Sequence, residues 1–256
     1  SGGEMLVRTE AGYILCADSD LALLSILVDS GDIERGTRLL IESLLRPGDC
    51  FVDVGANIAM HTLAAGRAMG ARGTIIAFEP FEPTRRLLLK SLWINGLEPI
   101  TLVHGCALSD RAGSQPLFLG ASSGLHSLFA QAGEEARADQ VQVHTMRLDD
   151  VLEPGRRVTL LKIDAEGAEL AVLAGAAATL RGNPDIALIV EFGPAHLRRA
   201  GHEVDAVAHA PYRAPCGRMV AQLGQDLGDE VDDHRKKGEH QQDEDPVQRT
   251  SGTHHV

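Results

Sequence analysis

Residues 51–62, FVDVGANIAMHT, contain the transition that decides the fold. An apolar run ends around Asp53, two small residues follow at Gly55 and Ala56, and Asn57 precedes a stretch with helical spacing. Small residues let a ligand approach the backbone closely, and the free N–H groups that open a helix attract an anion. The stretch therefore predicts a strand, a tight turn and a helix, with the turn as a candidate ligand site.

This turn differs from two well-known phosphate-binding motifs. A dinucleotide fingerprint, Gly-x-Gly-x-x-Gly, would need glycines where the chain has Asn57 and Met60, and the Gly-Lys-Ser/Thr of a P-loop is absent. A plain tight turn between a strand and a helix remains the alternative to a ligand site.

Strands alternate with helices along most of the chain. Apolar runs predict strands at 50–56, 73–80, 100–108, 158–167 and 186–192, and less regular ones at 114–119 and 141–148. Helical spacing and end signals predict helices at 35–46, 60–70, 82–96 and 168–182. Continuous apolar strands are typical of strands buried on both faces. The pattern predicts an α/β fold with a mostly parallel sheet, helices on both faces, and ligands beyond the carboxyl ends of the strands.

Carboxylates close several of these apolar runs. Glu79 ends a strand about two dozen residues after the glycine turn, where an acidic residue can accept hydrogen bonds from ribose hydroxyls. Asp164 falls at a strand tip and should face the same cleft, and Glu191 closes the last strand. Glu169 suits a helix N-terminus. For Glu166, a helix-entry role and an active-site role are equally supported.

Composition limits the classes of partner. The 256 residues carry a net charge of −12, which argues against a nucleic-acid partner held by phosphate contacts. The four cysteines lie far apart without a Cys-x-x-Cys pair, so neither a zinc site nor a disulfide framework is expected. No run approaches the length of a membrane span, and SGGEMLV lacks the regions of a signal peptide. We therefore expect a cytoplasmic protein that binds neither membranes nor nucleic acid.

Four segments together resemble a known family. FVDVGANIAMHT, AFEP, CALSD and LLKIDAEGAELAVLAG, in that order and spacing, resemble FkbM-type S-adenosylmethionine-dependent methyltransferases over residues 37–200. The resemblance implies a Rossmann-like class I methyltransferase sheet, S-adenosylmethionine as cofactor, and O-methylation of a small-molecule hydroxyl on a sugar or natural product. The family's loop usually reads Gly-Ala-Asn-x-Gly, whereas Ala59 replaces the last glycine here. We expect this extra methyl group to cost some cofactor affinity.

The resemblance also implies where the methionine part of the cofactor would bind. Its carboxylate would lie near the helix N-terminus that follows Gly55, beside the side chains of Asn57 and Thr62. Its ammonium group would be met by backbone carbonyls and by Asp53.

The resemblance places the nucleoside part of the cofactor on the next two strands. Glu79 would hold the ribose hydroxyls. Cys106 and Ala107 would flank the adenine, and Asp110 is a further candidate for cofactor binding.

Methyl transfer to a hydroxyl needs a base or a metal ion to deal with the acceptor's proton. The sequence offers five candidates for this chemistry: His61, His126, Asp164, Glu166 and Glu191. Asp164 is preferred, as a base or as a cation ligand, with Glu166 and His126 as further catalytic candidates. His126 lies in the polar loop SSGLHSL, where a lid could form, although a solvated loop histidine is the more common case. No tight His/Asp cluster demands a metal, so metal binding stays open.

The chain divides into three parts by composition. We expect a lead-in segment at 1–48, a cofactor-binding domain at 49–202 and an atypical acidic tail at 203–256 that is largely disordered from 224. Family members continue with further strands, whereas the pattern here stops near Ala200, which predicts missing or replaced C-terminal strands.

An incomplete sheet would leave the edge of the last strand partly uncovered and prone to self-association. In the alternative interpretation, DAVAHA and RMVAQL supply the missing strands. Two further functions remain: a degenerate cofactor-binding protein without catalysis, and a dehydrogenase-type enzyme, which Asn57 and Met60 disfavour.

Overall fold

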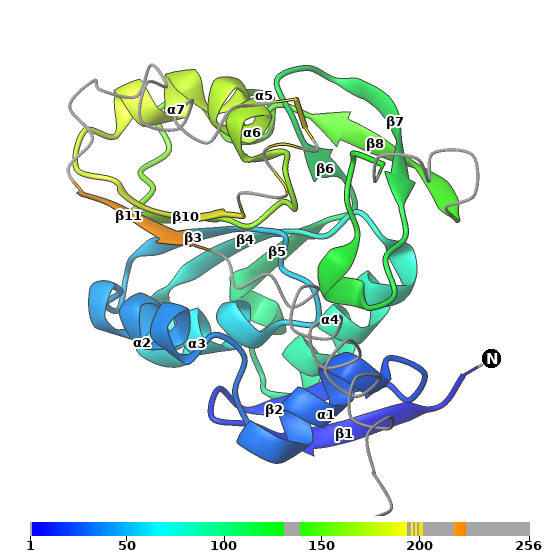
Figure 1. Cartoon of the computed structure of the whole chain (residues 1–256). Coiled ribbons are helices and arrows are strands. Elements are labelled where there is room, and N and C mark those ends of the chain that lie inside the picture. Colours follow the sequence, from blue (N-terminus) through cyan, green and yellow to red (C-terminus); the bar gives the residue numbers. More distant parts are fainter. Residues whose placement is uncertain are drawn as a thin grey trace, which may run out of the picture. The chain divides into compact units, whose positions relative to one another are not determined.

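Six parallel strands form the central sheet. They are β3 (Cys50–Val54), β4 (Thr74–Phe78), β5 (Thr101–His104), β9 (Leu160–Ile163), β10 (Ala187–Phe192) and β11 (Arg218–Leu223). Their spatial order is β11–β10–β9–β3–β4–β5 (Figure 1). The chain therefore builds outward from β3 to β5 and resumes on the other side of β3 with β9, so strand order reverses between β3 and β9.

The computed structural model describes residues 2–130, 139–193, 196, 198, 200, 201 and 218–223. They all lie within one compact unit, Ser1–Gly224. Among them, no helix has both the length and the apolar character needed to cross a bilayer.

Successive side chains of the sheet pack into two separate cores. Phe51 and Ile75 face one core, together with residues of α2 (Arg35–Leu44), α3 (Met60–Met69) and α4 (Glu82–Ile94). Val52 and Ile76 face the other, with α5 (Leu148–Val151), α6 (Glu169–Gly175) and α7 (Ala177–Gly182). Figure 1 shows these helix groups on opposite faces of the sheet. Burial on both faces explains why the strands are continuous apolar runs.

Two predicted elements are interrupted in the structure. The predicted strand 100–108 is divided into β5 and β6 (Ala107–Leu108), because β6 joins a second sheet in the order β6–β8–β7. That sheet also contains β7 (Gly113–Phe118) and β8 (Gln140–Met146). The predicted helix 168–182 is divided into α6 and α7 at Ala176, whose φ of −104° and ψ of 8° lie outside helical geometry.

The N-terminal segment contains elements that the sequence did not predict. A hairpin of β1 (Glu4–Arg8) and β2 (Tyr13–Ala17) precedes α1 (Leu21–Ser30). Leu15 N–H donates to Ser91 Oγ at 3.0 Å and Tyr13 N–H to Asn95 Oδ1 at 3.0 Å, which fixes β2 against α4. Three short 3-10 helices complete the described elements: η1 (Gly70–Arg72), η2 (Glu98–Ile100) and η3 (Ser123–Leu125).

The C-terminal edge of the sheet differs from our main expectation. RMVAQL forms β11, which pairs in parallel with β10 from Ala187↔Arg218 to Phe192↔Leu223. The prediction that the edge of β10 is left uncovered is therefore wrong, because a strand from the segment assigned to the tail completes it. DAVAHA and residues 224–256, including the predicted disorder, lie outside the described residues.

Candidate active site

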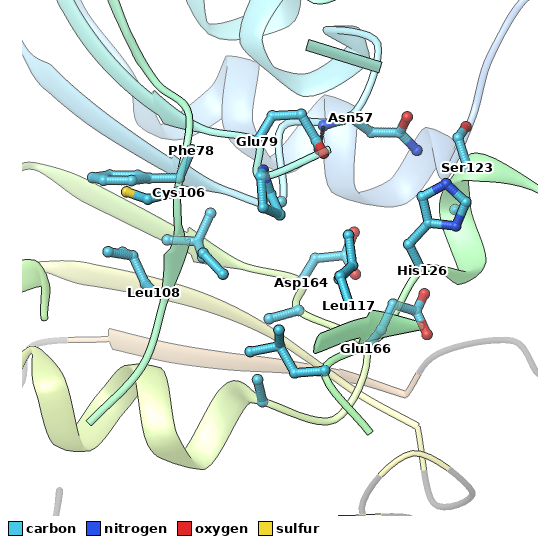
Figure 2. A pocket seen from close by; sticks show the side chains of 18 residues that line it. Asn57, Phe78, Glu79, Cys106, Leu108, Leu117, Ser123, His126, Asp164 and Glu166 are labelled. Atoms are coloured by element: carbon cyan, nitrogen blue, oxygen red, sulfur yellow. Dashed lines mark hydrogen bonds between the residues drawn. The ribbon is translucent and has the colours of Figure 1, made fainter. Parts of the chain in front are cut away.

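A pocket opens at the carboxyl ends of β3, β4 and β9, at the point where strand order reverses. This is where open parallel sheets bind their ligands. The space is about 650 Å³, including the part open to solvent. Eight of the predicted site residues line it: Gly55, Asn57, Glu79, Cys106, Ala107, His126, Asp164 and Glu166. Figure 2 shows apolar Phe78, Cys106 and Leu108 at one end and polar Asn57, Ser123 and His126 at the other.

Gly55 is required by the packing of the turn. Its φ is +75°, and a Cβ atom there would overlap the carbonyl oxygen of Asp164. The N–H groups of Gly55 and Ala56 both donate to Phe78 O, at 3.1 and 3.0 Å. The glycine therefore lets the end of β3 lie directly against the end of β9. The packing of the protein alone requires glycine at this position, whether or not a ligand also does.

Ala59 occupies a backbone conformation that favours glycine. It precedes α3 with φ +98° and ψ 7° and is fully buried. Asn57 also has positive φ, +46°, but asparagine adopts this region more readily than alanine does. Replacing the family's glycine by Ala59 therefore does more than add one methyl group, because it also strains the backbone at this position.

Glu79 is a buried carboxyl group held by backbone donors. It is 7% exposed, and its two oxygens accept the N–H groups of Asn57 at 3.1 Å and Phe81 at 2.9 Å. Burial raises the pKa of Glu79 to about 7, although these hydrogen bonds act in the opposite direction. Each oxygen keeps a lone pair for a further donor. Asn57 Oδ1 is buried and accepts no hydrogen bond from the described residues.

Cys106 and Ala107 form part of the apolar wall of the pocket, where an adenine ring would be expected. Both are buried, and burial raises the pKa of the Cys106 thiol. Asp110 is exposed, accepts the Ser109 hydroxyl at 3.2 Å, and is absent from the lining.

Lys162 was not predicted as a site residue, yet it lies at the centre of the buried charges. Its Nζ lies 2.9 Å from Gly55 O, 3.1 Å from Asp164 Oδ2 and 3.4 Å from Asp53 Oδ1. Burial would lower the pKa of Lys162, but the Asp164 and Asp53 carboxylates outweigh it and raise the pKa. A charged residue inside the apolar run LLKI is the signal that could have found it.

Asp53 and Thr62 lie behind the turn and do not line the pocket. Both side chains are fully buried, and the Thr62 hydroxyl donates to Asp53 Oδ2 at 2.6 Å. Through these contacts with each other and with Lys162, the two side chains stabilise the turn at Gly55.

Asp164 belongs to a second group of acidic residues. One oxygen each of Glu34, Asp164 and Glu191 lies within 4.8 Å of the others. Burial would raise the pKa of Asp164, but Lys162 and hydrogen bonds with Glu191 and Lys162 hold it below its ordinary value. The Asp164 charge and then burial raise the pKa of Glu191 to about 10. Burial and the Asp164 charge raise the pKa of Glu34 to about 7.

His126 and Glu166 line the pocket with different surroundings. His126 Nδ1 accepts the N–H of Gly120 at 3.1 Å, and burial lowers its pKa. A neutral imidazole in this arrangement carries its proton on Nε2, so it acts there as a donor. Glu166 Oε2 lies 2.9 Å from His196 Nδ1, and Glu166 O accepts the Ser127 hydroxyl at 2.6 Å.

Glu169 has the helix-terminal role that the sequence favoured. It is 2% exposed, and its Oε1 accepts the N–H groups of Ala165 at 3.1 Å and Gly167 at 2.9 Å. The carboxylate thus satisfies backbone donors at the start of α6.

The parallel sheet, its reversal point and the cleft define a Rossmann-like α/β fold with its ligand site at the point where strand order reverses. The chain belongs to the methyltransferase FkbM domain family, whose model matches residues 53–225. It is 34% identical over 149 residues to Methyltransferase 1 of Beauveria bassiana (strain ARSEF 2860), which is 50% of this chain and 59% of that protein.

Two further similarities extend this comparison. The chain is 34% identical over 153 residues to Methyltransferase sdnD of Sordaria araneosa, which is 48% of this chain and 59% of that one. A crystal structure of methyltransferase FkbM from Methylobacillus flagellatus KT matches at 18% identity and a TM-score of 0.44, over 65% of this chain and 37% of the other. The chain spans 59% of the length of each of the two curated relatives.

Proposed function

We propose that this protein transfers a methyl group from S-adenosylmethionine to a hydroxyl oxygen of a small molecule, such as a sugar or natural product. The observation that carries this proposal is one cleft with Glu79 and Asp164 on either side of the Gly55 turn. Membership of the methyltransferase FkbM domain family supports it.

Several groups of the pocket support this choice of cofactor. Glu79 can accept the ribose hydroxyls with the lone pairs left free by Asn57 and Phe81. The Asn57 Oδ1 and Ser123 Oγ atoms are buried without hydrogen-bond partners among the described residues, so both can meet polar ligand atoms. Asp164 and Glu166 also line the pocket, where Lys162 and His196 already contact their carboxylates. When bound, S-adenosylmethionine supplies an electrophilic methyl group on a sulfonium.

Positioning is the main contribution expected from the protein. Holding the acceptor oxygen in line with the methyl group can supply about 7–11 kcal/mol of barrier reduction. Asp164 is our first candidate to accept the acceptor's proton, because Lys162 keeps it ionised at the edge of the pocket. Glu166 is a further candidate base, and His126 fits better as a hydrogen-bond donor to the acceptor.

Titration calorimetry with S-adenosylmethionine, with NAD as the control ligand, tests the cofactor. Binding of NAD alone would overturn the proposal in favour of a dehydrogenase-type enzyme. A screen of hydroxyl compounds with methyl-labelled cofactor then tests catalysis, and nuclear magnetic resonance of the product identifies the methylated atom. A product methylated on nitrogen or carbon would overturn the O-methyl assignment.

A second candidate is a cofactor-binding protein without catalysis. The strained Ala59 in the cofactor turn favours it. Cofactor binding without transfer to any acceptor in the screen is the outcome that this candidate predicts.

A further inference from the structure

Three carboxyl groups converge beside the pocket. One oxygen each of Glu34, Asp164 and Glu191 lies within 4.8 Å of the other two. This spacing is slightly more than twice a typical metal–oxygen distance of about 2.0–2.2 Å, so small side-chain rotations bring all three onto one ion. We propose that Glu34, Asp164 and Glu191, together with His61, bind one divalent transition-metal ion.

The strand register places these groups on one face of the sheet. Side chains alternate along a strand, and Leu160 of β9 and Ile189 of β10 face the core that contains α2 and α3. Asp164 and Glu191 follow these residues at even spacing and therefore face the same side. Glu34 immediately precedes α2, and His61 lies in the first turn of α3, so both approach from the helices that cover this face.

Lys162 does not neutralise all three carboxyl groups of Glu34, Asp164 and Glu191. Its ammonium has three acceptors, Gly55 O, Asp164 Oδ2 and Asp53 Oδ1, at 2.9, 3.1 and 3.4 Å. Lys162 Nζ has no ion pair with Glu34 or Glu191 among the described residues. Glu191 hydrogen-bonds to Asp164 and Glu34 to Thr37. Neither carboxyl group is paired with a lysine or arginine among the described residues, so a metal ion would supply the missing positive charge.

His61 gives an independent indication of a ligand. It is 6% exposed, and its Nε2 atom is buried with no hydrogen-bond partner among the described residues. That atom points toward Glu34, with Oε2 3.8 Å away, which is too far for a hydrogen bond. A buried, unpaired ring nitrogen is costly, and a metal ion between His61 and Glu34 would remove this cost.

The donor set indicates the kind of metal. Three carboxylate oxygens and one imidazole nitrogen suit Mn²⁺, Fe²⁺ or Zn²⁺, whereas Mg²⁺ and Ca²⁺ prefer oxygen ligands alone. The Glu34 side chain is 30% exposed, which gives an ion a path from solvent.

The site touches the pocket through Asp164, which belongs to both. An ion there could hold the acceptor oxygen and lower its pKa, a role that rests on the proposed methyltransferase function. Metal binding itself is independent of that function and can be measured without cofactor.

The test uses the full chain, treated with chelator and then titrated with Mn²⁺. Loss of the electron paramagnetic resonance signal of free Mn²⁺ counts the bound ions, and we expect one per chain. Glu34→Gln, Glu191→Gln and His61→Gln should each weaken Mn²⁺ binding by about tenfold or more, because affinity follows ligand charge and number. Glu153→Gln, an exposed acid outside the group, should bind like the wild type.

Thermal melts give a second, independent measure of Mn²⁺ binding. Mn²⁺ should raise the melting temperature of the wild type and of Glu153→Gln, and this rise should be lost in Glu34→Gln and Glu191→Gln. If Glu191→Gln fails to fold, Glu34→Gln decides, because Glu34 lies outside the sheet. No stoichiometric Mn²⁺ in the wild type, or wild-type affinity in the folded variants, would overturn the site.

Titration with S-adenosylmethionine on the same samples separates the two proposals. Cofactor binding without Mn²⁺ binding would overturn the metal site alone. Mn²⁺ binding without cofactor binding would overturn the methyltransferase proposal alone.

Discussion

Replacing Ala59 with glycine should stabilise this protein, although the change removes a buried methyl group. Ala59 has φ +98° and ψ 7°, beyond the small left-handed region open to ordinary residues. Such a residue stores about 1–3 kcal/mol of strain. Because the φ of Ala59 lies well outside the left-handed region, we take its strain energy to be near the upper end of this range. Lost methyl burial costs about 0.8 kcal/mol, and the added freedom of the unfolded chain about 0.4–1 kcal/mol. The balance is a gain of about 1 kcal/mol.

Ala64→Gly is the matched control for this change. Ala64 lies in α3, the helix that Ala59 precedes, and is equally buried, but its φ is not positive. Glycine inside a helix costs about 0.5–1 kcal/mol, and the lost methyl adds about 0.8 kcal/mol. Ala64→Gly should therefore destabilise, so the two substitutions should have opposite signs.

Guanidinium unfolding followed by circular dichroism gives the free energies, and thermal melts give a second readout. One kcal/mol corresponds to a shift of roughly 2–4 °C for a chain of this size, so Ala59→Gly should raise the melting temperature by that amount. Cofactor affinity should stay equal or improve. A loss of stability equal to that of Ala64→Gly would show that the backbone at position 59 is not strained.

The remaining predictions concern the two carboxyl groups of the cleft. Glu79→Ala should weaken S-adenosylmethionine binding by about 1.5–3 kcal/mol per lost hydrogen bond, and an unchanged calorimetric affinity would remove Glu79 from the site. Burial raises the pKa of Glu79 to about 7, and ribose hydroxyls favour the ionised carboxylate. Wild-type affinity should therefore fall as the pH drops below about 7, whereas a profile equally steep in Glu79→Gln would contradict this origin. Asp164→Asn should lower turnover more than cofactor affinity, and equal losses in the two constants would assign Asp164 to cofactor binding.

Much of the sheet follows from local patterns in the sequence. Continuous apolar runs predict β3, β4, β9 and β10 because both faces of these strands are buried. The hairpin of β1 and β2 has no such signal, since β1 is largely exposed. The hairpin depends on contacts of β2 with α4 and of both strands with α1. β11 lies in a segment of mixed composition, and its pairing with β10 is a tertiary contact that local patterns do not specify.

The candidate site divides in the same way. Glu79 and Asp164 are predictable because an acid that ends a buried strand must lie at the sheet edge where ligands bind. Glu34 could not be found, because it lies just before α2 and only the fold brings it to Asp164. The role of Ala59 also needed the structure, since strain depends on a backbone angle that the residue type alone does not give.

The hydrogen bond from Lys162 to Gly55 O joins residues 107 positions apart. Contacts this distant are entropically costly to close and slow the folding of the domains that depend on them. β3, β4 and β5 can pair in the order of synthesis, whereas the wall that Asp164 adds to the cleft cannot form until β9 has been made and has returned to β3. A nascent chain that has been made only as far as FVDVGAN therefore has the turn but lacks the rest of the cleft. Tight ligand binding then indicates that β9 has paired with β3 and that the sheet is assembled.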